Sequence, residues 1–231
     1  MTFPLPEIPL QTRIPRQSNI ITPLYNWDVR AGRYTSRATG RFVSFAEVRG
    51  ALENVIFATG NNMVVISSQL QNGYITLATW ERQMMAEIKA LHIASAAASK
   101  GGWAQMTTAD WGYVGSKIRA QYDYLRNFAS QIYSGKQKLD GRFIVRTKLY
   151  GQAGRGTFES MRRREAITKG YDLEIRILGI ADHCPGCLQQ SALKWQPIGT
   201  LDAIGEEECA TNCHCYFMFK NSATNEIIEF Y

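Results

Sequence analysis

The chain has 231 residues, and its length and composition exclude several classes of protein. Hydrophobic residues make up 45% of it and charged residues 20%, the profile of a folded protein with a substantial core. No apolar run reaches the roughly 18–20 residues that a membrane-spanning helix requires. Residues 1–6 lack the basic start and the apolar stretch of a secretory signal. We therefore expect a protein without a membrane segment, folded in a cytosol where thiols stay reduced.

The net charge of +6 is concentrated in two stretches of the chain. Residues 12–49 contain seven arginines against two acidic residues, and residues 142–169 contain eight basic residues against two acidic ones. Basic patches of this kind suit a polyanion or an acidic protein surface. Solvated helix faces explain the same charge equally well.

Residues 1–43 are predicted to form an extended basic arm. Prolines prevent a continuous helix there and favour extended backbone: Pro4, Pro6, Pro9, Pro15 and Pro23. Residues 33–43 interleave arginine with aromatic side chains, a combination that can contact phosphates or a protein groove. The candidate partner-binding or DNA-binding side chains of the arm are Arg30, Arg33, Arg37 and Arg41.

Residues 44–170 are predicted to form a helical domain. Ser44 and Glu47 have the spacing of a capping box, so a helix should begin at Phe45. We expect this helix to end near Gly60 and a second helix to cover residues 62–71. Thr76 should cap a third helix, whose apolar residues recur at helical spacing and which continues through the alanine-rich residues 94–98.

Two more helical stretches follow. Thr107 or Thr108 should cap a helix that ends at Gly135. A basic helix is then predicted over residues 142–169, where three glycines in residues 151–156 indicate a kink or close packing against another backbone. Its three consecutive arginines, Arg162, Arg163 and Arg164, are further candidates for partner or DNA contact.

Residues 171–231 are predicted to form a small β-rich module, which makes the whole chain an α+β protein with a mainly helical body. Apolar residues alternate with charged ones over residues 173–177, as in a half-buried strand. Residues 216–219 read as another strand, and residues 226–231 as a third that follows a turn at residues 221–225. All five cysteines of the chain lie in this module.

The cysteine spacing predicts a metal site. Cys184 and Cys187 form a Cys-Pro-Gly-Cys element in which a tight turn aims two thiolates at one point. Cys213 and Cys215 would share one face of an extended segment. These four are the predicted ligands of a structural zinc, with Cys209, His183 and His214 as alternates. Cys209 is the predicted spare thiol, because the three glutamates before it oppose thiolate formation.

Two other interpretations of the cysteines stay open beside zinc. Paired disulfides could form after release from the cell. A thioredoxin-like redox pair is the weakest interpretation, because no βαβ pattern surrounds Cys184 and Cys187. No nucleophile elbow, phosphate-binding loop or zinc-protease motif occurs in the sequence, and the chain has only three histidines. We therefore expect a protein that is not an enzyme.

Three segments of the chain resemble the C-terminal domain of the phage Mu F-like minor head proteins. They are the stretch from Arg146 to Phe158, the element Cys184-Pro185-Gly186-Cys187, and the closing Asn212-Cys213-His214-Cys215. The likeness covers about residues 140–220. The family usually closes with His-Pro-x-Cys-x-Cys, whereas this chain has Ala210-Thr211-Asn212 and an additional Cys209.

The resemblance implies a portal-associated minor head protein, located in the virion and assembled in the host cytoplasm. It would be present in several copies per particle, would contact portal or capsid proteins, and would act in head assembly or in DNA packaging and ejection. Its basic stretches could also touch phage DNA. The alternative function is a zinc-stabilised nucleic-acid-binding protein.

Overall fold

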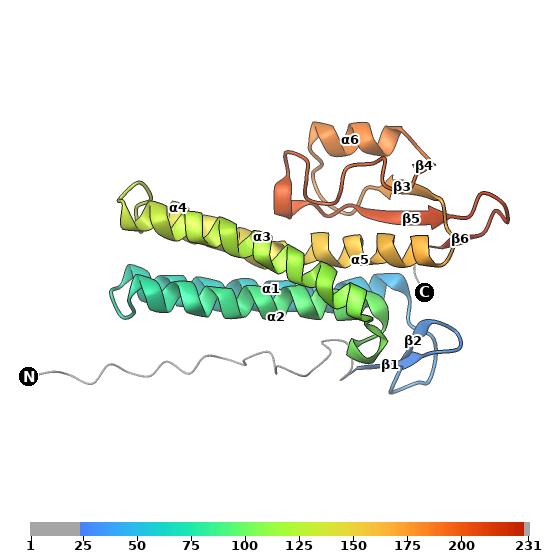
Figure 1. Cartoon of the computed structure of the whole chain (residues 1–231), viewed down its shortest axis with the longest axis horizontal. Helices are drawn as coiled ribbons and strands as arrows, with labels where there is room; N and C mark the ends of the chain where they lie inside the picture. Colours follow the sequence, from blue (N-terminus) through green and yellow to red (C-terminus); the bar gives the residue numbers. More distant parts are fainter. Residues whose placement is uncertain (1–23, 229–231) are drawn as a thin grey trace, which may run out of the picture.

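The computed structural model describes residues 24–228, which form a mainly helical α+β fold with a cysteine-rich C-terminal region (Figure 1). Residues 1–23 and 229–231, which include most of the predicted arm and the end of the predicted last strand, lie outside the described residues. Within residues 24–228, none of the helices combines the length and the apolar character needed to cross a membrane.

Long helices with side-chain caps build the body. Helix α1 (Phe45–Gln71) begins with the predicted capping box, in which Ser44 and Glu47 bond each other's backbone. Thr76 caps α2 (Leu77–Lys100), and Thr107 caps α3 (Thr108–Tyr133). The capping prediction is therefore confirmed for all three helices. Each cap bonds a backbone N–H group that the first turn of a helix leaves unpaired.

The predicted break at Gly60 is wrong, because α1 continues through it without interruption. Gly60 instead allows close contact with α4 (Gly141–Gln152). A Cβ atom added to Gly151 would lie 2.8 Å from the Cα of Gly60. A glycine inside a helix costs about 1 kcal/mol relative to alanine, and here the close approach of two backbones explains why it is tolerated.

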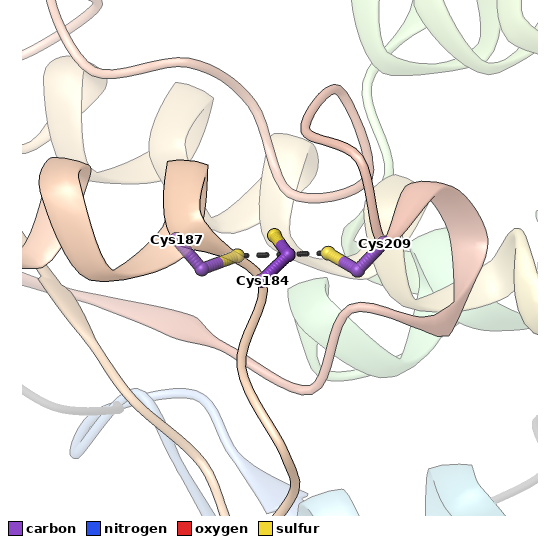
Figure 2. A group of neighbouring side chains, drawn as sticks. All are labelled: Cys184, Cys187 and Cys209. Atoms are coloured by element: carbon purple, nitrogen blue, oxygen red, sulfur yellow. Dashed lines mark hydrogen bonds between the residues drawn. The ribbon is translucent and has the colours of Figure 1, made fainter.

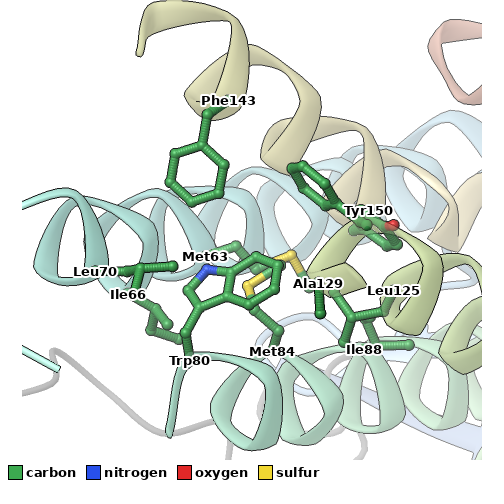
Figure 3. Close-up of a cluster of buried hydrophobic side chains, with 11 residues drawn as sticks. Met63, Ile66, Leu70, Trp80, Met84, Ile88, Leu125, Ala129, Phe143 and Tyr150 are labelled. Carbon is green, nitrogen blue, oxygen red and sulfur yellow. The ribbon is translucent and has the colours of Figure 1, made fainter. Parts of the chain in front are cut away.

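The largest hydrophobic cluster joins α1, α2, α3 and α4 (Figure 3). Trp80 lies at its centre and is fully buried, with the rings of Phe128 and Phe143 at 5.5 and 5.8 Å. The indole N–H donates to the hydroxyl oxygen of Ser67, which in turn contacts Thr147. The polar end of the tryptophan is therefore satisfied inside the core.

The predicted basic helix is divided into α4 and α5 (Gly154–Thr168), which meet at Ala153. Both expected reasons for the glycines apply, since the chain breaks here and also packs closely. A Cβ atom at Gly154 would lie 2.8 Å from the hydroxyl of Ser95, and one at Gly156 would lie 2.8 Å from the carbonyl oxygen of Ile204. The glycines thus let α5 contact both α2 and the C-terminal module.

Residues 24–43 form a hairpin that is docked on the helices. Strand β1 (Tyr25–Asp28) pairs antiparallel with β2 (Arg33–Ser36). Tyr34 is fully buried, donates its hydroxyl to the carbonyl oxygen of Ala98, and meets the ring of Trp27 edge-on at 4.9 Å. This part of the predicted arm therefore belongs to the body.

The C-terminal module is a four-stranded antiparallel sheet with strand order β4-β3-β5-β6. Its strands are β3 (Leu173–Ile177), β4 (Gln196–Pro197), β5 (Tyr216–Lys220) and β6 (Ile227–Ile228). The sheet lies between α5 and α6 (Pro185–Ala192) (Figure 1). The strands at residues 173–177 and 216–219 are confirmed, whereas α6, β4 and the hairpin of β1 and β2 were not predicted.

Candidate metal centre

Helix α6 positions the first two cysteines. Cys184 is its N-cap and Pro185 follows in the first turn, where a proline costs no hydrogen bond. Cys187 comes one turn later and is buried. The helix start therefore directs both thiols of the Cys-Pro-Gly-Cys element toward the loop that precedes β5.

The other three cysteines lie on that loop. Cys209 and Cys213 flank the short helix η2 (Ala210–Asn212), and Cys215 directly precedes β5. Two arginines of the helical body hold the loop in place. Arg49 donates to the carbonyl oxygen of His214 at 2.9 Å, and Arg155 donates to that of Thr211 at 3.2 Å.

The five thiols converge on Cys187. Its Sγ atom lies 3.5 Å from Sγ of Cys209 and 3.6 Å from Sγ of Cys213. Cys184, Cys187 and Cys209 form one group with mutual distances within 4.8 Å, and Cys187, Cys213 and Cys215 form a second. Figure 2 shows the first group, with Cys187 on α6 facing Cys209 across from it. Either group can hold a metal ion.

The distances between the thiols fit metal ligands better than disulfides. All five cysteines belong to the described residues, and all five are free there. A disulfide requires about 2.05 Å between sulfur atoms, whereas thiolates at tetrahedral corners about 2.3 Å from a zinc ion are about 3.8 Å apart. The 3.5 and 3.6 Å separations around Cys187 are close to the tetrahedral value.

The thiols differ in how easily they ionise. The hydrogen bond from the Cys215 thiol lowers the pKa of Cys213 to about 4. The same hydrogen bond, together with burial, raises the pKa of Cys215. Burial also raises the pKa of Cys187 and of Cys209. A bound dication would favour the thiolate form at each of these positions, so metal binding must release protons.

Cys209, predicted to be the spare thiol, lies in the group of Cys184 and Cys187. Two of the glutamates that precede it direct their carboxylates to backbone N–H groups. Glu206 accepts from Ala203 at 3.0 Å, and Glu208 accepts from Gly186 at 3.1 Å. Burial, followed by neighbouring thiols, raises the pKa of Cys209.

A buried arginine adds positive charge beside the thiols. Arg176 on β3 is fully buried and donates to Sγ of Cys187 at 3.3 Å. Four thiolates around one dication carry a net charge of −2, so this guanidinium would offset part of the excess. No local sequence signal marks this residue, because Arg176 occupies an ordinary position in an alternating strand.

The two alternate histidine ligands lie at different places. His183 Nδ1 is 3.6 Å from Sγ of Cys215, while its Nε2 is 2.8 Å from the carbonyl oxygen of Gly179. His214 belongs to neither group of potential ligands. Burial lowers the pKa of His214. His183 is therefore the histidine that lies beside the thiols.

The arginines proposed to contact a partner separate into two classes. Four are exposed on and beside the hairpin: Arg30, Arg33, Arg37 and Arg41. In contrast, Arg162 is 1% exposed and pairs with Glu159 at 2.7 Å. Arg163 donates to Glu174 and to the carbonyl oxygen of Leu201. The prediction that these two contact a partner is wrong, since their charges are used inside the fold.

Arg164 differs from its two neighbours. It is half-buried, with its guanidinium 4.5 Å from the centre of the Tyr113 ring.

A scan against protein-family models, a search of curated proteins and a search of solved structures each found no match.

Proposed function

We propose that this chain is a structural protein of a bacteriophage particle, a portal-associated minor head protein without enzymatic activity. The observation that carries the proposal is the convergence of five thiols on Cys187, within the segment that resembles the Mu F-like minor head proteins. A zinc ion enclosed by four thiolates has no open position for water or substrate, so such a site stabilises architecture. Portal or capsid proteins are the proposed partners.

Mass spectrometry of purified phage particles tests this role. The protein should co-purify with the particles in several copies, at a constant ratio to the portal protein across a density gradient. A non-structural phage protein from the same lysate is the control and should be absent from the particle peak. Absence of this chain from intact particles would refute the proposed function.

The metal of the proposed site is one zinc ion held by Cys184, Cys187, Cys209 and Cys213. The first three already form a compact group, and Cys213 lies 3.6 Å from Cys187. Cys213 also interacts with the thiol of Cys209. Cys215, a ligand predicted from the sequence, belongs to the second group with Cys187 and Cys213, and its Sγ atom also contacts Nδ1 of His183. This ligand set has the spacing Cys-x2-Cys and Cys-x3-Cys.

Metal analysis of single cysteine variants distinguishes the two ligand sets. The wild-type protein should contain about one zinc per chain. Cys209→Ser should lower the zinc content to near zero, while Cys215→Ser should keep it. The opposite pattern would support the set predicted from the sequence. No metal in wild-type protein, together with no free thiols, would support disulfides and refute the zinc site.

The exposed hairpin arginines favour a second function, a zinc-stabilised nucleic-acid-binding protein. Within the described residues, none of these four side chains forms a salt bridge, so their charge is available to a polyanion. Each phosphate neutralised on duplex DNA should contribute about −0.9 to the slope of log affinity against log salt. Arg30→Gln with Arg41→Gln should make the slope shallower by about 2. Absence of DNA binding at low salt would exclude this function.

A further inference from the structure

A cavity of about 530 Å³ lies where the helical body meets the C-terminal module. Helices α2, α3, α4 and α5 line one part of it, and residues 203–206 and 210–213 line the other. Its volume lies within the range of roughly 300–1,000 Å³ that small-molecule sites occupy. The proposed structural role gives no function to this cavity.

Two buried polar atoms of the cavity lining have no partner among the described residues. His92 is 2% exposed, and its Nδ1 is 2.6 Å from the hydroxyl of Thr157, while its Nε2 has no hydrogen bond. The hydroxyl of Thr211 is also unpaired. A buried polar group without a partner costs about 1–3 kcal/mol. Both atoms belong to residues that line the cavity, where a ligand could satisfy them.

Two cations of the lining have no carboxylate partner within the described part of the chain. The ammonium group of Lys117 lies 5.5 Å from the centre of the Tyr113 ring. Arg146 bonds the neutral side chains of Gln131 and Gln137. Of the other charged residues of the lining, Arg155 pairs with Glu53, and Glu206 contributes one negative charge and accepts from the backbone N–H of Ala203. The cavity therefore has an excess of positive charge.

The imidazole of His92 is suited to donate a hydrogen bond to an anion. Burial, together with the charge of Lys117, lowers the pKa of His92 to about 4, so the ring is neutral near pH 7. When Thr157 donates to Nδ1, the proton of the neutral ring resides on Nε2. The unpaired Nε2 is then a donor, and an anion beside it would select this tautomer.

We propose that this cavity binds a small organic anion whose acidic group lies between His92 Nε2 and the ammonium group of Lys117. Apolar parts of the ligand would contact Leu149, Tyr150 and Ile204, which provide the non-polar lining. A few polar groups that converge in a mainly apolar cavity fix the orientation of a small ligand. The ligand would also connect the module to the helical body, since its contacts come from both.

Fluorescence titration with 8-anilinonaphthalene-1-sulfonate tests the site, because this probe joins an aromatic body to an anionic group. The full-length protein should bind it at one saturable site. Lys117→Gln should weaken binding about tenfold, the loss expected for one charge-assisted hydrogen bond. Lys136→Gln is the matched control, since Lys136 is exposed and does not line the cavity, and it should leave the affinity unchanged.

A second variant and a neutral probe separate the cavity from other apolar surfaces. Ala120 lines the cavity but is exposed, so Ala120→Trp should block the cavity without disturbing the core. It should abolish probe binding while leaving the circular dichroism spectrum unchanged. Uncharged N-phenyl-1-naphthylamine should bind equally to the wild type and to Lys117→Gln. The proposal would be overturned if the wild type did not bind the sulfonate probe, or if Lys117→Gln and Ala120→Trp both bound it as tightly as the wild type does.

Competition identifies the acidic group of the ligand. Benzoate and phenyl phosphate should displace the sulfonate probe, and the more effective competitor shows whether a carboxylate or a phosphate is preferred. Benzyl alcohol, which has the same ring without the charge, should not displace it. If benzyl alcohol displaced the probe as effectively as benzoate and phenyl phosphate do, the proposal would also be overturned.

Discussion

A buried ion pair connects the helical body to the sheet of the module. Glu159 and Arg162 are 3% and 1% exposed, and both bond the backbone of Phe217 on β5. Arg162 donates to the carbonyl oxygen of Phe217, and the N–H of Phe217 donates to Glu159. The guanidinium also lies 4.3 Å from the centre of the Phe45 ring. Arg162 thus joins α1, α5 and β5.

Replacing Arg162 should therefore reduce stability strongly. Arg162→Met leaves the charge of Glu159 buried without its partner, and breaking such a pair costs about 3–5 kcal/mol. Arg164→Met is the control, and because Arg164 is half-buried and stacked on Tyr113, we expect a loss of about 1 kcal/mol or less. Urea denaturation of the three proteins measures the difference. Equal losses for the two variants would contradict the role of the buried pair.

His92 should make the stability of the protein depend on pH. Its pKa falls from an ordinary value of 6.5 to about 4 in the folded state. Between these values the unfolded chain binds more protons, so the free energy of unfolding decreases as the pH falls through this window. A shift of this size corresponds to about 3 kcal/mol.

The measurement is the difference between wild type and His92→Gln in urea denaturation at pH 7 and at pH 4.5. The glutamine does not titrate, so the variant should lose less stability over this interval. The comparison removes the contribution of acidic groups and of metal release, which both proteins share. Parallel losses in the two proteins would show that burial does not disfavour protonation of His92.

At the scale of elements, the hairpin of β1 and β2 depends on the end of α2. Gly101 follows α2 with a φ of 83°, and a Cβ atom at this position would lie 2.0 Å from the ring of Trp27. The glycine therefore meets two requirements, a left-handed backbone and close contact with an aromatic ring.

Gly101→Ala should cost more than the backbone conformation alone. Gly73 has a φ of 72° with no atom within 4 Å of an added Cβ, so Gly73→Ala isolates the conformational cost of about 1–2 kcal/mol. We expect Gly101→Ala to cost about 1 kcal/mol more, because Trp27 must move. Urea denaturation measures both losses, and hydrogen exchange should show reduced protection only in residues 25–36 of Gly101→Ala. Equal costs would contradict this docking of the hairpin.

Local sequence signals predicted the helix caps well but predicted the packing contacts poorly. Ser44, Thr76 and Thr107 act on their own first turns, so their spacing is sufficient. Gly60 reads locally as a helix end, yet its contact with Gly151 depends on a helix far along the chain. Asp28 and Gly32 are a local turn signal for the hairpin of β1 and β2. Asp28 accepts hydrogen bonds from the N–H groups of the second and third residues after it.

The candidate site shows the same division. The sequence predicted that the cysteines gather, because Cys184 and Cys187 share one turn of chain. It could not assign Cys209, whose position depends on how the loop folds against α6. Arg176 and His92 gave no signal either, since their partners come from distant elements. The short helix α6 did have a signal in Pro185, which occupies a first-turn position that favours proline.

At the scale of the whole molecule, the body and the module have different sources of stability. The body contains three hydrophobic clusters, the largest built around Trp80. The module has one, and the cysteines make up a large part of it: Cys187, Cys213 and Cys215 are buried members, and Cys184 and Cys209 pack against them. The cluster of thiols is thus a large part of the core of the module.

Removal of zinc should consequently unfold the module before the body. Binding free energy of a structural zinc contributes directly to folding, whereas the clusters of α1, α2 and α3 contain none of the proposed ligands. After treatment with a chelator, hydrogen exchange should show lost protection in β3 and β5 and retained protection in the three long helices. Added zinc should restore protection, and added magnesium should not, because thiolates are poor magnesium ligands. Simultaneous loss of protection in both parts, or none in either, would contradict a zinc-dependent module on an independently stable helical body.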